Sequence, residues 1–264
     1  SMIDSHCHLN FESIRNKFLT IIDNAKKNNI TSILSINTEP DQFEEHYNLI
    51  KDYNSIYLSY GLHPEHVTNT KLISKDLISK YSKIDKVIGI GETGLDFYHS
   101  TQYKKEQYKV FEEHIEASIE TNLPLIIHQR NSENEIMETL NNYQKTNNLR
   151  VVFHCFTGTA KLKKFCLDRN YFLSLSGIVT FKNANELRDT IKDVPISSIL
   201  IETDSPFLSP VPLRGKINEP SHVKFTAQYL SEFFQIPLNK IIKNTDDNFY
   251  NLFTKAIKYN EIYK

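Results

Sequence analysis

The chain has 264 residues, a formal net charge of −1, 39% hydrophobic residues and 24% charged residues. This composition is typical of a globular protein, and it argues against a protein that coats long duplex DNA with a basic surface. No apolar run approaches the roughly 20 residues of a membrane helix. The N-terminal segment lacks a signal-peptide pattern, and Ser1 is expected to be an expression-tag remnant. Three irregularly spaced cysteines predict no disulfide framework and a cytoplasmic location.

Short apolar runs alternate with amphipathic helical patterns along the chain. Runs such as 87–90 and 125–127 are apolar without alternation, which is typical of parallel strands covered on both faces. The longest helix is predicted over 101–121. A proline-rich loop at 205–221 precedes two further predicted helices, 222–235 and 238–255. The predicted strands are 2–6, 32–37, 56–61, 86–91, 124–128, 150–154, 172–176 and 198–203.

Eight strands that alternate with helices predict an α/β fold, a single (β/α)8 TIM barrel domain over residues 1–264. A doubly wound open sheet is the competing arrangement. No repeat, low-complexity tract or linker divides the chain. In a barrel the carboxyl ends of the strands form one rim, where active sites lie, so the residues at the strand ends indicate the function.

Histidines and carboxylates end or follow six of the predicted strands. His6 and His8 form an H-x-H pair whose side chains share one face of the first strand, and His63 follows the third. Four imidazoles and two carboxylates are enough ligands for two metal ions bridged by a carboxylate. The predicted metal ligands are His6, His8, Glu92, His128, His154 and Asp204.

This mixed nitrogen and oxygen ligand set suits Zn²⁺, Mn²⁺, Co²⁺ or Ni²⁺ in the purified protein. Mg²⁺ is expected as the working ion, because availability and geometry decide which metal is used.

Six segments and a seventh loop resemble the TatD family of metal-dependent deoxyribonucleases, a group of amidohydrolase-like barrels. The likeness runs in order from residue 3 to about 253. The resemblance implies a Mg²⁺-stimulated deoxyribonuclease that acts as a 3′→5′ exonuclease on single-stranded DNA. The segments are Asp4-Ser5-His6-Cys7-His8-Leu9, Gly61-Leu62-His63-Pro64, Gly91-Glu92-Thr93-Gly94-Leu95-Asp96, Ile127-His128-Gln129-Arg130, His154-Cys155-Phe156-Thr157-Gly158, Glu202-Thr203-Asp204-Ser205-Pro206 and Arg214-Gly215-Lys216-Ile217-Asn218-Glu219-Pro220.

The resemblance implies that the six residues above are the metal ligands and that Glu92 is the bridging carboxylate. Asp204 would also accept a proton from the attacking water, so Asp204 and Glu92 are the predicted catalytic residues. Glu202, which shares a strand face with Asp204, is predicted to orient a ligand histidine.

Substrate contacts are predicted for His63, Arg130 and Arg214, with Arg130 suited to hold a phosphate. Each of these three residues also has a simpler interpretation. His63 could cap the turn at Pro64, Arg130 could pair with Glu202, and Arg214 could be a solvated loop charge.

Other residues in or near the motifs are expected to have structural roles. Asp96 is expected to stabilise the loop after the fourth strand, and Phe97-Tyr98 either packs in the core or supports a nucleobase. Cys7 and Cys155 are expected as small buried side chains. Surface positions are expected for His46, His99, His114 and His222.

Four positions depart from the family pattern without removing a ligand, and two of them, Glu65 and Ile217, make the rim less positive. The other two are Thr93 and Thr157.

A different hydrolase on the same barrel, such as a D-aminoacyl-tRNA deacylase, is the alternative function. A non-catalytic nucleic-acid-binding protein is a third hypothesis, disfavoured by the complete ligand set. DNA, single-stranded or at its ends, is the expected partner of a monomer with no membrane and no obligate protein partner.

Overall fold

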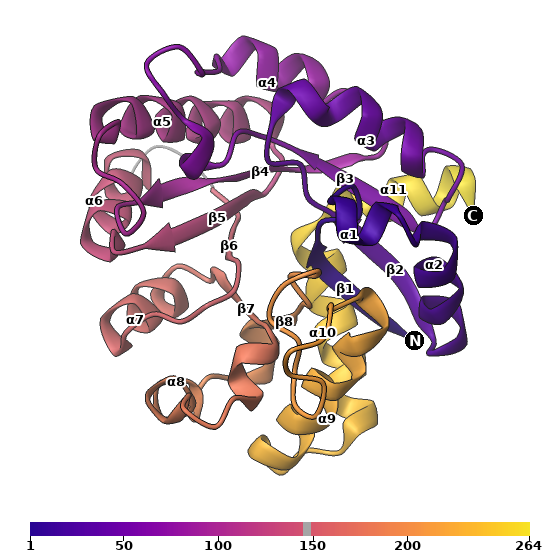
Figure 1. The fold of residues 1–264 in the computed structure, drawn as a ribbon. Helices are drawn as coiled ribbons and strands as arrows, with labels where there is room; N and C mark the ends of the chain where they lie inside the picture. The colour runs from indigo at the N-terminus through magenta and orange to yellow at the C-terminus, as the bar shows by residue number, and fades with distance from the viewer. Residues whose placement is uncertain (145–148) are drawn as a thin grey trace. The chain divides into compact units, whose positions relative to one another are not determined.

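The computed structural model describes residues 1–144 and 149–264 (Figure 1). The chain divides into two compact units. Helices alternate with strands along both of them, as the sequence predicts. The first unit comprises residues 1–35 and 154–251, and the second comprises residues 36–153 and 252–264.

In the first unit, β1 pairs in parallel with β2 and β7 pairs in parallel with β8. The last strand β8 also contacts β1, and α9 packs on both of them. The first and last strands of the chain therefore lie next to each other. The elements are β1 (Met2–Cys7), α1 (Glu12–Arg15), α2 (Phe18–Lys27), β2 (Ile30–Ser35), α7 (Ala160–Asp168), β7 (Phe172–Leu175), α8 (Asn185–Ile191), β8 (Ile199–Ile201), α9 (Val223–Phe234) and α10 (Leu238–Leu252).

In the second unit, β3, β4, β5 and β6 pair in parallel in chain order. The long helix α5 packs against β4 and α4 (Figure 1). The elements are α3 (Phe43–Ile50), β3 (Ile56–Tyr60), α4 (Lys75–Tyr81), β4 (Val87–Asp96), α5 (Lys104–Thr121), β5 (Leu125–Arg130), α6 (Glu133–Gln144), β6 (Val151–Phe153) and α11 (Thr254–Tyr263).

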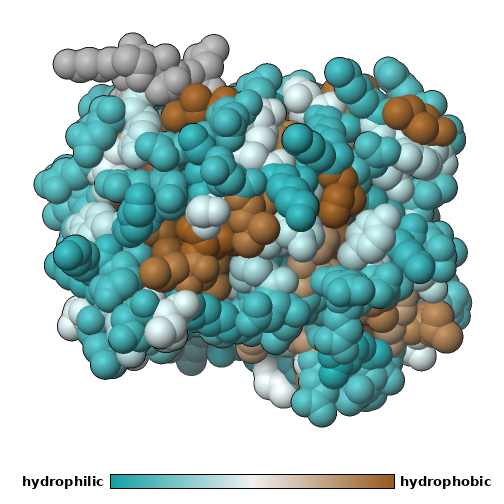
Figure 2. Space-filling model, turned by 90° about the horizontal axis from the view of Figure 1, so that it is seen from above, coloured by the Kyte–Doolittle hydropathy of each residue, from teal (hydrophilic) through white to brown (hydrophobic). Residues whose placement is uncertain are grey.

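Most strand residues are buried, which explains unbroken apolar runs such as 87–90 in β4 and 125–127 in β5. Every residue of β1, β3 and β4 is buried, as expected for parallel strands with both faces covered. Hydrophilic residues make up most of the surface in Figure 2, with smaller hydrophobic patches between them. Among the described residues, no helix combines the length and apolar character needed to cross a membrane.

Several element boundaries differ from the sequence prediction, most of them by one to three residues. Strand β2 begins two residues earlier than predicted. Strand β4 continues five residues beyond its predicted end, because an irregularity between Ile90 and Thr93 shifts its register and pairing then resumes. The helix predicted over 238–255 ends at Leu252, because the backbone of Phe253 leaves the helical region, and α11 follows.

Candidate metal centre

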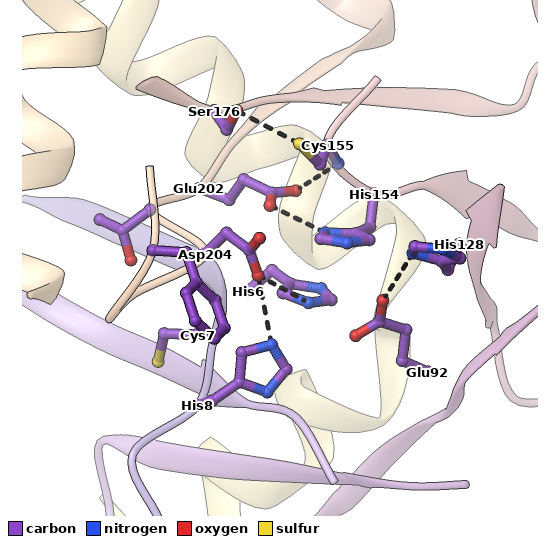
Figure 3. Close-up of polar contacts among 12 residues, drawn as sticks. His6, Cys7, His8, Glu92, His128, His154, Cys155, Ser176, Glu202 and Asp204 are labelled. Atoms are coloured by element: carbon purple, nitrogen blue, oxygen red, sulfur yellow. Dashed lines mark hydrogen bonds and ion pairs between the residues drawn. The ribbon is translucent and has the colours of Figure 1, made fainter. Parts of the chain in front are cut away.

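The first unit brings together four of the six predicted ligands. His6 lies in β1 and His8 just after it, and the His6 ring stacks on that of His154 with centroids 3.6 Å apart. The Asp204 carboxylate points toward both His6 and His8 (Figure 3). Its Oδ1 lies 3.2 Å from Nε2 of His8 and 3.6 Å from Nε2 of His6. All three imidazoles are buried, so this is a compact donor set with little exposure to water.

Backbone contacts after β8 hold Asp204 against the end of β1. The Asp204 N–H donates to the His6 carbonyl oxygen at 2.8 Å. The buried Asp4 carboxylate accepts hydrogen bonds from the backbone N–H and the hydroxyl of Thr203. Burial raises the pKa of Asp4 to about 8. Asp204 itself has a φ of 54°, a left-handed conformation that costs a non-glycine residue about 1 kcal/mol, so its neighbours must hold it there.

Glu202 makes the contact that its predicted orienting role requires. Its Oε2 lies 2.9 Å from Nδ1 of His154, and its Oε1 accepts the Cys155 N–H at 2.9 Å (Figure 3). A proton on Nδ1 of His154 puts the ring's lone pair on Nε2, the form that binds metal. Burial raises the pKa of the Cys155 thiol to about 12, so the thiol is neutral. Its sulfur lies 3.4 Å from the Ser176 hydroxyl. Cys155 is only partly buried, whereas Cys7 is fully buried as predicted.

The second unit brings His63 and Glu92 together. Glu92 lies within β4, not at the end of a strand as predicted, because that strand continues after the register shift. Its Oε2 lies 3.1 Å from Nε2 of His63. The Glu65 N–H donates to Nδ1 of His63, so the ring proton is on Nε2 and points at Glu92. Burial lowers the pKa of His63, which keeps the ring neutral near pH 7.

His128, in β5, lies between two carboxylates. Its Nε2 is 2.8 Å from Oδ2 of Asp96 and its Nδ1 is 3.3 Å from Oε2 of Glu92. A proton on Nε2 makes the short bond to Asp96 and turns the Nδ1 lone pair toward Glu92, a pairing that suits a shared cation. A Cβ at Gly94 would lie 1.8 Å from the His128 carbonyl oxygen, so only glycine allows β4 to approach β5 this closely.

Asp96 has a larger role than the loop stabilisation that the sequence predicts. It does accept the backbone N–H groups of Tyr98 and His99, but it also holds the imidazole of His128. Burial alone would raise the pKa of Asp96, yet its hydrogen bond to His128, the charge of His128 and its hydrogen bonds to His99 lower that pKa below the usual range. The sequence contained a signal for this role, since Asp96 lies four residues after Glu92 and therefore shares its strand face.

Two predicted substrate residues have their guanidinium groups stacked on aromatic rings. Arg130 lies 3.6 Å from the centre of the Tyr98 ring, and Arg214 lies 3.5 Å from that of Phe181. The interpretation of Arg214 as a solvated charge alone is therefore incomplete. A stacked guanidinium is held in one plane and keeps its edge donors for an anion.

The prediction of surface positions is wrong for two histidines. His46 and His114 are fully buried, because they lie on the inner faces of α3 and α5. Nδ1 of His114 donates to the Val110 carbonyl and Nε2 accepts the Leu62 N–H at 3.1 Å. Burial lowers the pKa of His114 to about 4. This histidine therefore holds the loop that carries His63.

The donor atoms in each unit fit a divalent metal. Imidazole nitrogens and carboxylate oxygens within 4.8 Å of one another match the ligand chemistry of zinc and related ions. Buried carboxylates stand behind His154 and His128, as is typical of metal-binding histidines. Among the described residues, the sets that lie within one unit are His6, His154, Glu202 and Asp204 in the first, and His63, Glu92 and His128 as well as Glu65, Asp96 and His99 in the second.

Comparison with known proteins agrees along nearly the whole chain. The family model described as TatD related DNase matches residues 3–254. A Buchnera aphidicola protein described as an uncharacterized metal-dependent hydrolase is 39% identical over 257 residues, which cover 96% of each chain. The metal-dependent hydrolase YabD of Bacillus subtilis is 35% identical, over 96% of this chain and 98% of its own.

Solved structures confirm the fold. The TatD homologue YjjV from Escherichia coli superposes with a TM-score of 0.87 at 24% identity, over 96% of this chain and 98% of that one. A TatD-family hydrolase from Entamoeba histolytica gives 0.83 at 21% identity, over 96% and 98%. The predicted (β/α)8 barrel is confirmed, and the doubly wound sheet is excluded. The chain belongs to the TatD related DNase family, a family of metal-dependent hydrolases.

Proposed function

We propose that this protein is a metal-dependent deoxyribonuclease that removes nucleotides from the 3′ end of single-stranded DNA. The observation that carries the proposal is the pair of buried histidine–carboxylate clusters, one in each unit, each with a second carboxylate behind a histidine. In a (β/α)8 barrel all strand ends of one kind share a rim. Each cluster lies mainly at such strand ends.

The six predicted residues would hold two divalent ions, with Mg²⁺ as the working ion. Glu92 would be one of the metal-binding carboxylates, and Glu202 and Asp96 would stay behind the histidines that they orient. When bound, the ions would supply Lewis-acid activation of water and stabilise negative charge on phosphoryl oxygens.

Asp204 is the residue proposed to move the proton. Its carboxylate, 14% exposed, is the most accessible acceptor of the first cluster, while Glu202 is fully buried and engaged with His154 and Cys155. Asp204 would accept a proton from the attacking water, whose oxygen would bond to phosphorus as the P–O3′ bond to the preceding nucleotide breaks. The departing 3′ oxygen would take up a proton from solvent, and Asp204 would return its proton to solvent.

The phosphate would be positioned by His63, Arg130 and Arg214. His63 is neutral and carries its proton on Nε2, so it can donate to a phosphoryl oxygen by exchanging its bond to Glu92. Arg130 and Arg214, held by their stacked rings, would present fixed donors to the strand.

The test is cleavage of end-labelled oligodeoxynucleotides by metal-stripped protein before and after Mg²⁺ is added back. The proposal predicts that only Mg²⁺-loaded protein shortens single-stranded DNA, one nucleotide at a time. A 3′-blocked strand should resist cleavage, and internal cuts would show endonuclease action instead. If Mg²⁺ restores no cleavage while an ester or aminoacyl-tRNA substrate is hydrolysed, the nuclease assignment is wrong.

The predictions of a monomer and of a cytoplasmic location complete this proposal. Sedimentation of the purified protein and imaging of the tagged protein in its cell test them.

A further inference from the structure

An exposed phenylalanine lies three residues after the proposed general base. Phe207 is 51% exposed, and its backbone N–H donates to the Asp204 carbonyl oxygen at 3.0 Å. Exposed apolar side chains are common when they stand alone. Phe207 instead contacts Phe11, whose ring stacks on the metal-ligand candidate His8.

The backbone around Phe207 is held rigidly. The fully buried Asn218 donates through its side-chain amide to the carbonyl oxygens of Phe207 and Thr203, at 2.8 and 2.9 Å. The backbone N–H of Asn218 donates to the Pro206 carbonyl oxygen at 3.1 Å. The position of the exposed ring is therefore set by buried hydrogen bonds rather than left to a flexible loop.

Phe11 joins this ring to the candidate metal ligand His8. The Phe11 and His8 rings stack, with centroids 4.5 Å apart and planes 14° from parallel. The Phe207 ring meets Phe11 edge to face at 5.8 Å and 73°. The Phe11 and Phe207 rings thus form two aromatic walls at a steep angle, beside the histidine that contacts Asp204.

We propose that Phe11 and Phe207 form a stacking subsite for one nucleobase of the strand that is cleaved. This inference rests on the proposed nuclease function and adds a base-binding element to it. Base–aromatic stacking accepts every base, because every base has a π face. It would thus support removal of nucleotides without regard to sequence.

The charges of the same loop favour a nucleotide over an apolar acyl group. Arg214 and Lys216 are exposed, against the single acidic residue Glu219 in the segment 205–221. A flat apolar corner with cations on the same loop complements a flat base attached to anionic phosphates.

The experiment compares the parent with Phe207→Leu, which keeps apolar volume but removes the π face. Each Mg²⁺-loaded protein is given single-stranded oligonucleotides with normal 3′-terminal nucleotides or with abasic ones. We expect Phe207→Leu to raise KM for the normal strand roughly 5- to 100-fold, the effect of losing one stacked base, with kcat changed much less. On the abasic strand the two proteins should have the same KM.

Ile217→Ala is the matched control, because Ile217 is an exposed apolar residue of the same loop with 53% exposure. It should leave both KM values unchanged. The subsite is refuted if Phe207→Leu matches the parent on the normal strand, or if it loses as much on the abasic strand. A parent that cleaves neither strand contradicts the nuclease function itself, and the subsite with it.

Discussion

Replacing Asp96 tests whether His128 is a metal ligand that depends on a buried carboxylate behind it. The Asp96 side chain is fully buried, and its Oδ2 lies 2.8 Å from Nε2 of His128, the distance of a charge-assisted hydrogen bond. Asp96→Asn keeps the size and one acceptor but removes the charge. Loss of such a partner lowers metal affinity about 10- to 100-fold, or about 1.4 to 2.8 kcal/mol.

The assay is calorimetric titration of metal-stripped protein with Mn²⁺, with thermal unfolding followed in parallel to confirm the fold. Asp41→Asn is the matched control, because the Asp41 carboxylate is 85% exposed. The Mn²⁺ affinity of this variant should equal that of the parent. The reasoning fails if Asp96→Asn binds Mn²⁺ as tightly as the parent, or if both variants lose affinity equally.

Three further outcomes are expected. Burial lowers the pKa of His114 in the folded state to about 4 from 6.5, so the parent should lose about 3 kcal/mol of unfolding free energy between pH 6.5 and pH 4. His114→Gln should show a smaller loss over the same pH range, measured by urea unfolding. Gly94→Ala, whose Cβ would strike β5, should destabilise by at least about 3 kcal/mol. A Cβ at Gly215 would have no atom within 4 Å, so Gly215→Ala should lower the unfolding free energy by only about 1 kcal/mol. Equal melting temperatures of the two glycine variants would contradict this difference. Arg214→Ala should reduce the slope of log affinity for single-stranded DNA against log salt by about 0.7, and an unchanged slope would rule out a phosphate contact.

The fold could be predicted because its signals are local. Unbroken apolar runs such as 87–90 in β4 and 125–127 in β5 mark parallel strands, and each strand is followed by a helical pattern. The predicted ends of β1 and β8 lie within two residues of the observed ends, so the sequence places His6, His8 and Asp204 together. In the structure the side chains of these three residues meet in one unit.

The less local features could not be predicted. The continuation of β4 beyond Glu92 depends on a register shift near Gly91 that no apolar pattern reveals, and the spacing of Asp96 from Glu92 becomes a signal only once that continuation is known. The burial of His114 depends on which face of α5 turns inward, and helical periodicity treats a polar residue there as exposed. The break at Phe253 is set by local backbone conformation.

The most direct test of the central claim is single-turnover cleavage of end-labelled single-stranded DNA by Asp204→Asn in saturating Mg²⁺. Asp193→Asn serves as control, because its carboxylate is 68% exposed. The account predicts that Asp204→Asn cleaves at least about 100-fold more slowly than the parent, the usual contribution of a general base, while Asp193→Asn is unchanged. Cleavage by Asp204→Asn at the parent rate would contradict it.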